Sequence, residues 1–523
     1  MCRGGGSGEV GIVMSKWLGW SLGAIVLMGS VLYVVMDHAA CVDTEAVVLH
    51  NWQDYGWWTL RAGYVVNEGG LHSGDAVRIL HGHLSTVLWP YHLVTLLTGS
   101  LSAAYGLVYL AFLILSLLAF WWAFADKRSA LLWGFALACS PAFLRSFLDV
   151  DPVSHGLLYT AVLFPVGLRL LSGATTTRPR MAAALVLLMC VLSLDWPNAM
   201  ALAIWAPLFL MLHGAHLNWR RAFWLLLPLG LFSAALMVLM ILHKQQGLVS
   251  LSFLAKHYTA GADVHAGDFG VAWLVAIKRH GMASGIGWLP LWGLWLVALF
   301  RRPSLSGSAW WLCLLPVGLS LLLLLVLKDY FAAHQWLVAP LVANGLTAAV
   351  WGLDFLRNRQ RQTGTDAHRG WWWPLPLMLA YGLVFALFFR MNNADKTLTH
   401  ELLARHTPRQ AVILLYPYDH TKDGKPLEIA KRASLEFDRL VEPYEPGKGA
   451  QVTAGGRPCF VLAKAPLPKG ELVARAEVAH GFLDRVSGRV LDVYRQKISQ
   501  RRKGDSSEWS GWLYLYRESN NQQ

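Results

Sequence analysis

Acidic residues lie in the segments that separate the long apolar runs of this chain. Asp54 lies in segment 37–83, and Asp149 and Asp151 lie one residue apart between two apolar runs. Carboxylate oxygens are the preferred ligands of hard divalent cations such as Mg²⁺ and Mn²⁺. Such an ion can neutralise a phosphate leaving group, while a separate carboxylate takes a proton from an acceptor. The carboxylates therefore predict a cation site beside the bilayer, with further candidates at Asp195, Asp263 and Asp268.

The same aspartates also have structural uses. Asp151 is followed by Pro152 and then by an apolar run. Aspartate as a cap with proline in the first turn is a common way to begin a helix. Asp149 has no such use in the sequence, so it is the better candidate ligand of the two.

The apolar runs indicate the class of protein. Of 523 residues, 55% are hydrophobic and only 15% are charged, whereas soluble domains carry roughly 25% charged residues. The runs are about 17–23 residues long, which matches a bilayer core about 30 Å thick. We therefore predict a mostly α, polytopic membrane protein with about 11 spans, at 17–36, 102–124, 129–147, 154–172, 181–194, 197–213, 222–242, 284–300, 309–327, 335–356 and 371–390.

The distribution of basic residues predicts the orientation of these spans. Alternate short loops carry twelve Lys and Arg residues: Lys127, Arg128, Arg178, Arg180, Arg220, Arg221, Arg301, Arg302, Arg357, Arg359, Arg361 and Arg369. By the positive-inside rule, these loops and the N-terminus are cytoplasmic in an inner (plasma) membrane, and segments 37–83 and 391–523 lie on the outer face. The formal net charge of +13 is thus mostly a topology signal. It does not indicate nucleic-acid binding, because no basic and aromatic interleaving accompanies it.

Two regions follow from the change in composition near residue 390. Residues 1–390 form the predicted membrane region, with the outer loop 37–83 inserted after its first span. Residues 391–523 are predicted to form an extracytoplasmic α/β domain. Runs rich in β-branched and aromatic residues predict strands at 411–419, 457–466 and 511–517, and apolar periodicity predicts a helix over 471–498.

The order of three segments carries a resemblance to a known family. They are QDYGWWTLRAGYVVNEGGL (53–71), FLDVDPVSHGLLYTAVLF (147–164) and SLDWPNAMALAIW (193–205). This order resembles the GT-C superfamily of polyprenol-dependent glycosyltransferases, most closely the catalytic subunit of bacterial oligosaccharyltransferases. The resemblance implies transfer of a sugar or oligosaccharide from a polyprenyl phosphate or diphosphate donor to an acceptor on the outer face.

The resemblance also implies roles for individual residues. Asp54 and Arg61 match the family's acidic and basic residues in the first outer loop, where Trp57 and Trp58 would contact sugars. Asp149 and Asp151, with His155 behind them, match its short acidic motif, so Mg²⁺ or Mn²⁺ would be held by Asp54, Asp149 and Asp151. Segment 328–346 resembles the family's phosphate-binding segment, with Lys328 or His334 in the place of its arginine. Interface anchoring is the alternative use of Lys328 and of the tryptophans.

The chain departs from the family pattern at its acceptor end. The WWDYG motif is missing from 391–523, and the similar string WQDYGWW (52–58) lies in the first loop. The acceptor is therefore left open between a protein and an envelope glycan or lipid A.

A transporter or flippase of lipid-linked sugars is the alternative function. That class places ionisable residues within its spans, on broken helices near the bilayer midplane. The predicted spans are nearly free of charge, and the acidic residues lie in loops. This distribution favours the transferase.

Overall fold

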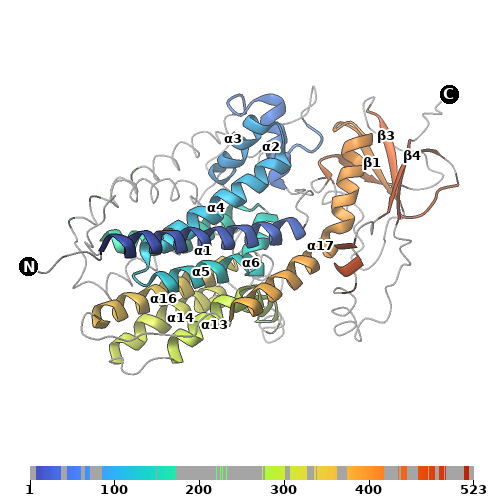
Figure 1. Cartoon of the computed structure of the whole chain (residues 1–523). Coiled ribbons are helices and arrows are strands. Elements are labelled where there is room, and N and C mark those ends of the chain that lie inside the picture. Colours follow the sequence, from blue (N-terminus) through green and yellow to red (C-terminus); the bar gives the residue numbers. More distant parts are fainter. Residues whose placement is uncertain are drawn as a thin grey trace, which may run out of the picture. The chain divides into compact units, whose positions relative to one another are not determined.

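The chain is described from a computed structural model (Figure 1). The described residues are 7–36, 44–60, 65–70, 85–148, 150–171, 220, 224, 227, 231, 274, 277–300, 307–326, 335–336, 338–361, 374–416, 434, 437–444, 457–468, 470–477, 482–483, 485–487, 489 and 512–517. They belong to two compact units. Residues 1–32, 83–89 and 107–383 form the helical unit, and residues 33–82, 90–106 and 384–523 form the mixed unit.

The helical unit is built from long apolar helices. Its elements are α1 (Ser7–Val35), α4 (Leu101–Ala123), α5 (Lys127–Ala138), α6 (Pro141–Leu148), α7 (Pro152–Leu171), η1 (Ser85–Leu88), η3 (Gly281–Gly285), η4 (Ile286–Trp288), α13 (Leu289–Phe300), α14 (Gly307–Val326), α16 (Pro340–Arg361) and the first part of α17 (Pro374–His406). Helix α16 packs against α7, α13 and α14. The α14–α16 approach is close, because a Cβ at Gly345 would lie 2.6 Å from Ser320 Oγ. Buried tryptophan side chains tie the helices further, as Trp288 Nε1 donates to Ala339 O at 2.7 Å.

The helices confirm a membrane protein. Within the described residues, three helices are long and apolar enough to cross a bilayer, at Leu101–Ala123, Ile277–Phe300 and Pro374–Asn393, and a bent pair of helices would be a fourth if the pair counts as one span. The predicted spans at 181–194, 197–213 and 222–242 lie outside the described residues except for isolated positions. The count of eleven therefore stays a prediction.

One predicted span is two helices. Segment 129–147 divides into α5 and α6, which are bent by 54°. Pro141 follows the break, and proline has no N–H to continue the hydrogen bonds of the preceding helix. Ser140 N donates to Leu137 O at 3.0 Å instead, which closes the last turn of α5.

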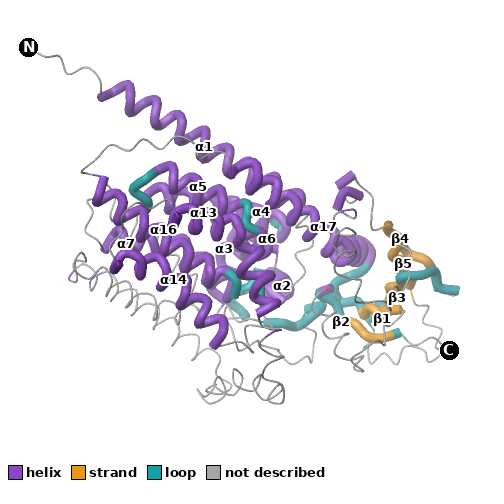
Figure 2. The backbone as a smooth tube through the Cα atoms, turned by 90° about the horizontal axis from the view of Figure 1, so that it is seen from below, coloured by secondary structure: helices purple, strands orange, loops and turns teal. Residues whose placement is uncertain are grey.

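The mixed unit contains helices α2 (Thr44–Tyr55) and α3 (Trp89–Thr98), residues 384–406 of α17, and a five-stranded sheet. Its strands are β1 (Val412–Tyr416), β2 (Leu440–Pro443), β3 (Cys459–Ala463), β4 (Glu471–Glu477) and β5 (Trp512–Arg517). They lie side by side in the order β2-β1-β3-β5-β4 (Figure 2). Strand β1 is parallel to β2 and β3, whereas β5 is antiparallel to β3 and β4.

The central strands β1, β3 and β5 carry buried residues on both faces of the sheet, whereas the edge strand β4 is largely exposed. Leu402 and Leu403 of α17 pack on the face formed by Ile413, Phe460, Leu462, Leu513 and Leu515. The opposite face carries Val412, Leu414, Val461, Ala463 and Tyr516. Helix α17 has 33 residues, about 50 Å at 1.5 Å per residue, so it is long enough to cross a bilayer and continue into this core.

The predicted strands at 411–419, 457–466 and 511–517 are confirmed as β1, β3 and β5. The predicted helix over 471–498 is wrong at its start, because residues 471–477 form β4. The register of β4 on β5 shifts between Leu472 and Ala474, and such an irregularity disturbs the alternation by which a strand is recognised. Strand β2 was not predicted. Loop 37–83, predicted as an insertion in the membrane region, groups with residues 384–523 in the mixed unit.

Candidate functional site

Helix α2 presents Asp54 at its end. The first turns of α2 are buried through Ala46, Val47, Val48 and Leu49, while the side chain of Asp54 is 50% exposed. Gly56 then takes a φ of +87°, and its N–H donates to Trp52 O at 3.0 Å. Glycine adopts this left-handed conformation without a Cβ clash, so it ends the helix there. Asp54 therefore lies two residues before the glycine at which the helix ends.

Aromatic side chains gather at the end of α2. The Trp52 and Trp57 rings lie 5.3 Å and 6.1 Å from the His92 ring of α3, measured between centroids. Trp58 lies 6.0 Å from Trp57 and is 82% exposed. The predicted sugar-contacting tryptophans are therefore close to Asp54 in the chain, and they differ in exposure. Trp57 is packed within the cluster, whereas Trp58 offers an open ring face for a ligand or a lipid headgroup.

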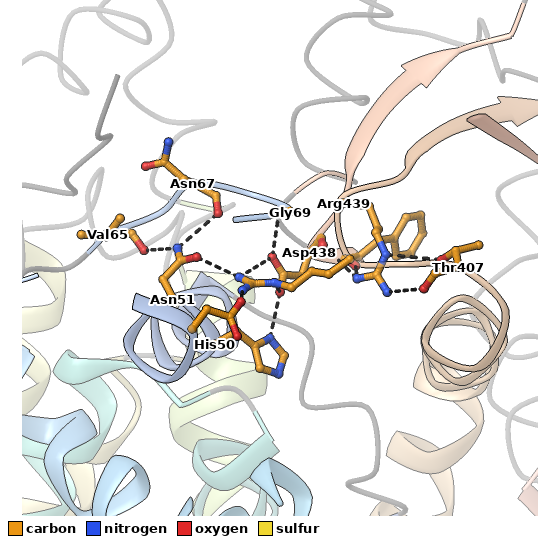
Figure 3. A network of polar contacts seen from close by, with 11 residues as sticks. His50, Asn51, Val65, Asn67, Gly69, Thr407, Asp438 and Arg439 are labelled. Carbon is orange, nitrogen blue, oxygen red and sulfur yellow. Dashed lines mark hydrogen bonds and ion pairs between the residues drawn. The ribbon is translucent and has the colours of Figure 1, made fainter. Parts of the chain in front are cut away.

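A buried carboxylate, Asp438, lies at the centre of a polar network in the mixed unit (Figure 3). It precedes β2 and adopts a φ of +47°, a conformation that Asp tolerates better than most residues. Its oxygens accept from His50 Nδ1 at 2.8 Å, from Arg409 Nε at 2.6 Å and from Gly69 N at 3.1 Å. Burial raises the pKa of Asp438, but the His50 hydrogen bond and the Arg409 charge outweigh burial and lower the pKa below its ordinary value.

Arg409 joins this buried carboxylate to Asp54. Its Nε and Nη2 form a two-point contact with Asp438, and its Nη1 is ion-paired with Asp54 Oδ2. Nη2 also donates to Asn51 Oδ1 at 2.9 Å. One guanidinium therefore contacts a residue before β2 and two residues of α2.

The segment Val65–Gly70 closes the other side of the network (Figure 3). Asn51 Nδ2 donates to Val65 O at 2.9 Å and to Asn67 O at 3.2 Å. Gly69 has a φ of +71°, and a Cβ there would lie 2.9 Å from the carbonyl oxygen of Arg409. The glycine thus allows the close approach that brings its N–H to Asp438.

Two further basic residues adjoin the network. Arg439 donates to the Asp438 carbonyl oxygen at 2.9 Å and to Thr407 O at 3.3 Å. His400 of α17 has a pKa of about 4, lowered by burial and then by the charges of His50 and Arg439, while Asp438 acts in the opposite sense. Arg409 and Arg439 therefore place two guanidinium groups against Asp438, while His400 is uncharged near neutral pH.

We expect acid to destabilise the mixed unit through His400. Between pH 6.5 and about 4 the unfolded chain binds a proton at His400 that the folded chain does not bind. Stability consequently falls as pH drops through this window, by up to about 3 kcal/mol for this group. His400→Gln should flatten the pH dependence of unfolding, measured by the protease resistance of the full chain in detergent. The control His406→Gln changes an exposed histidine of the same helix end, and an unchanged slope in His400→Gln would contradict the prediction.

In the helical unit, Asp151 caps helix α7. Its Oδ1 accepts from Val153 N at 2.7 Å and Ser154 N at 3.3 Å, and its carbonyl oxygen accepts from His155 N at 3.0 Å. This is the N-cap arrangement that the Asp151-Pro152 sequence predicts. His155 is fully buried, with its ring 5.0 Å from the Phe147 ring. Its surroundings are those of a packed side chain.

Asp151→Ala is expected to destabilise the start of α7 by about 1 kcal/mol, because it removes the acceptor for two backbone N–H groups. Asp151→Asn keeps a capping oxygen and removes the charge. Thermal unfolding in detergent should therefore rank wild type and Asn above Ala. Equal stability of Asn and Ala would contradict the capping role. Loss of activity in the Asn variant, which keeps the cap, would assign the charge to the chemistry.

The structure describes five of the nine predicted site residues, and these five belong to two different units. Asp54, Trp57 and Trp58 lie within or directly after α2, in the mixed unit, whereas Asp151 and His155 belong to α7 of the helical unit. Arg61, Asp149, Lys328 and His334 lie outside the described residues. Among the residues that the structure describes, no three His, Cys, Asp or Glu side chains are grouped as a metal site. Asp54 and Asp151 instead have the protein partners given above.

The sequence did not indicate Arg409, Asp438 or His50 as site residues. Arg409 stands just before a predicted strand, but nothing in its neighbourhood names a partner 355 residues away. Carboxylates and arginines next to strands are common, and their pairing depends on the fold.

Comparisons with known proteins add little to this geometry. No protein-family model matches the chain, and no curated protein matches its sequence. Among solved structures, the chain is similar to ArnT from Cupriavidus metallidurans bound to undecaprenyl phosphate, at 11% identity and a TM-score of 0.39, over 88% of this chain and 96% of that one. At that identity and TM-score the likeness assigns neither a family nor a substrate to this chain.

Proposed function

We propose that the chain is a membrane glycosyltransferase of the GT-C type. It moves a sugar or oligosaccharide from a polyprenyl phosphate or diphosphate donor to a protein or an envelope glycan on the outer face of the inner membrane. The observation that carries the proposal is the half-exposed Asp54 carboxylate at the end of α2, which is held by Arg409 and is followed four residues later by the exposed Trp58. A fixed carboxylate and an exposed aromatic ring are both groups that suit binding of a sugar or its acceptor.

The reaction requires a base at the acceptor. The bond between the anomeric carbon and the phosphate oxygen breaks, and the polyprenyl phosphate or diphosphate leaves with the electron pair. The acceptor oxygen or nitrogen bonds to the anomeric carbon and gives up a proton. Asp54 accepts that proton or orients the acceptor, which is general-base catalysis by a positioned carboxylate. The likeness to oligosaccharyltransferases rests on motif order alone, and the acceptor stays open between a protein and an envelope glycan or lipid A.

The metal and the phosphate-binding residues stay predictions. Mg²⁺ or Mn²⁺ bound by Asp54, Asp149 and Asp151 would supply Lewis-acid stabilisation of the leaving phosphate. The described carboxylates do not form such a site, and Arg409 already contacts Asp54. Arg61, Lys328 and His334 are proposed to contact the donor phosphate or the acceptor.

The transporter alternative has less support in the described residues. It requires ionisable side chains that are available to a cargo within the spans. Asp354 of α16, which lies near a span end, accepts from the backbone N–H groups of Ala125 at 2.5 Å and Asp126 at 3.1 Å. These contacts hold the α4–α5 connection, which is a structural use of the carboxylate.

The proposal is tested by comparing envelope glycans, lipid A and secreted proteins of the host with and without the chain. A transferase predicts the loss of one modification and the accumulation of its lipid-linked donor. The accumulated donor, radiolabelled and incubated with the purified full chain in lipid, should then release polyprenyl phosphate or diphosphate when the acceptor is added. EDTA and re-addition of Mg²⁺ or Mn²⁺ form the metal arm. If the chain moves the donor across the vesicle membrane without releasing polyprenyl phosphate or diphosphate, it is a transporter.

A further inference from the structure

We propose that Arg409 is a positioning residue for the transfer reaction and that it acts by fixing the Asp54 carboxylate. The inference rests on the proposed function of Asp54. It assigns a role in the chemistry to Arg409, which lies between α17 and β1. Arg409 is 355 positions away from Asp54 in the sequence.

The guanidinium of Arg409 is itself immobilised. Its Nε and Nη2 bind both oxygens of Asp438, a side chain that is 2% exposed. Asp438 is in turn held by His50 Nδ1 and by Gly69 N. A two-point contact of this kind fixes the plane of the guanidinium as well as its position.

The hydrogen bond to Asn51 further restricts the rotation of the Arg409 guanidinium. Asn51 is fully buried, and its amide nitrogen donates to Val65 O and Asn67 O. Its Oδ1 is therefore turned toward Arg409 Nη2. Three of the four acceptors around Arg409 belong to buried side chains, and the fourth is Asp54.

The three side chains that contact one another, Asp438, Arg409 and Asp54, differ in solvent exposure. Side-chain exposure rises from 2% at Asp438 through 19% at Arg409 to 50% at Asp54. In an ordinary surface ion pair both side chains are mobile, so neither side chain fixes the position of the other. Here only the carboxylate is free to move, and a fixed guanidinium at Oδ2 restricts its rotation. The consequence is a carboxylate whose second oxygen keeps one direction, which is what a base acting on a bound acceptor requires.

The test is Arg409→Lys in the full chain, assayed for transfer from the radiolabelled donor. Lysine keeps the charge but cannot bind Asp438 at two points while contacting Asp54. We expect kcat to fall about 10–100-fold with the donor KM nearly unchanged, because a misplacement of about 1 Å has effects of this size. The matched control is Arg405→Lys, which changes an exposed arginine paired with Glu401 on the same segment and should leave kcat unchanged.

Activity is expressed per folded molecule, so that a loss of folded protein is not counted as a loss of catalysis. Asp54→Glu, which moves the carboxylate by one methylene, should also lower kcat. The losses of Asp54→Glu and Arg409→Lys should not multiply in the double variant, because both break the same contact. If Arg409→Lys does not fold, Asn51→Ala loosens the same guanidinium and should lower kcat with KM unchanged.

The outcomes separate the two proposals. Wild-type kcat per folded molecule in Arg409→Lys or Asn51→Ala, or fully multiplicative losses in the double variant, would overturn the positioning role while leaving the transferase intact. No transfer by the wild-type chain with its accumulated donor would overturn the proposed function, and with it the role of Arg409.

Discussion

Replacing Asp54 by asparagine is expected to abolish glycan transfer while leaving the amount of folded protein unchanged. Asparagine has nearly the same shape but cannot accept the acceptor proton, and a general base contributes roughly 10²–10⁴-fold to a rate. The fold should tolerate the change, because the Asp54 side chain is half exposed at the end of α2 and the buried contacts of Arg409 persist. The measurement is the initial rate of transfer from the labelled donor, per folded molecule.

A matched control is Glu401→Gln, which removes an exposed carboxylate of the same unit. It should transfer at the wild-type rate. Normal transfer by Asp54→Asn would remove Asp54 from the site and would leave the tryptophans and the Arg409 network without a catalytic assignment.

Replacing Asp438 is expected to have the largest effect on stability. Asp438→Asn leaves the Arg409 guanidinium without its buried counter-charge, and removal of one partner of a buried ion pair typically costs about 3–5 kcal/mol. Asn keeps the hydrogen-bonding shape and tolerates positive φ. Asp438→Ala adds the strain of a non-glycine residue at a φ of +47°, about 1–2 kcal/mol. Asp438→Gly removes the side chain without that strain.

Protease resistance of the mixed unit in the full chain, followed against denaturant, measures these differences. The expected order of stability is wild type, then Asn, with Gly above Ala. Because the free energy of folding of a domain is typically 5–15 kcal/mol, the Ala variant should lose much of its folded mixed unit at moderate denaturant. Equal stability of Asn and wild type would mean that the ionised carboxylate contributes nothing, and equal stability of Gly and Ala would contradict the role of φ.

Much of the architecture follows from local pattern. Apolar runs of bilayer length correctly locate α4, α7, α14 and α17, because helix formation and membrane insertion both depend on consecutive residues. The cap at Asp151 is equally local, since its acceptors and donors lie within four residues. Local pattern fails at β4. Its register shift on β5 is a property of the pair of strands rather than of either sequence.

The candidate site divides along the same line. By itself the sequence determined a membrane protein and three of the five strands, β1, β3 and β5. Asp54 with its neighbouring tryptophans is a site that the sequence predicts. Only the tertiary structure decided that Arg409 and Asp438 meet α2, across separations of 355 and 388 residues. Contacts at such separations depend on how whole elements pack, and no periodicity or spacing in a single sequence encodes which carboxylate an arginine will reach. The residue that holds Asp54 in place is therefore visible only in the folded chain.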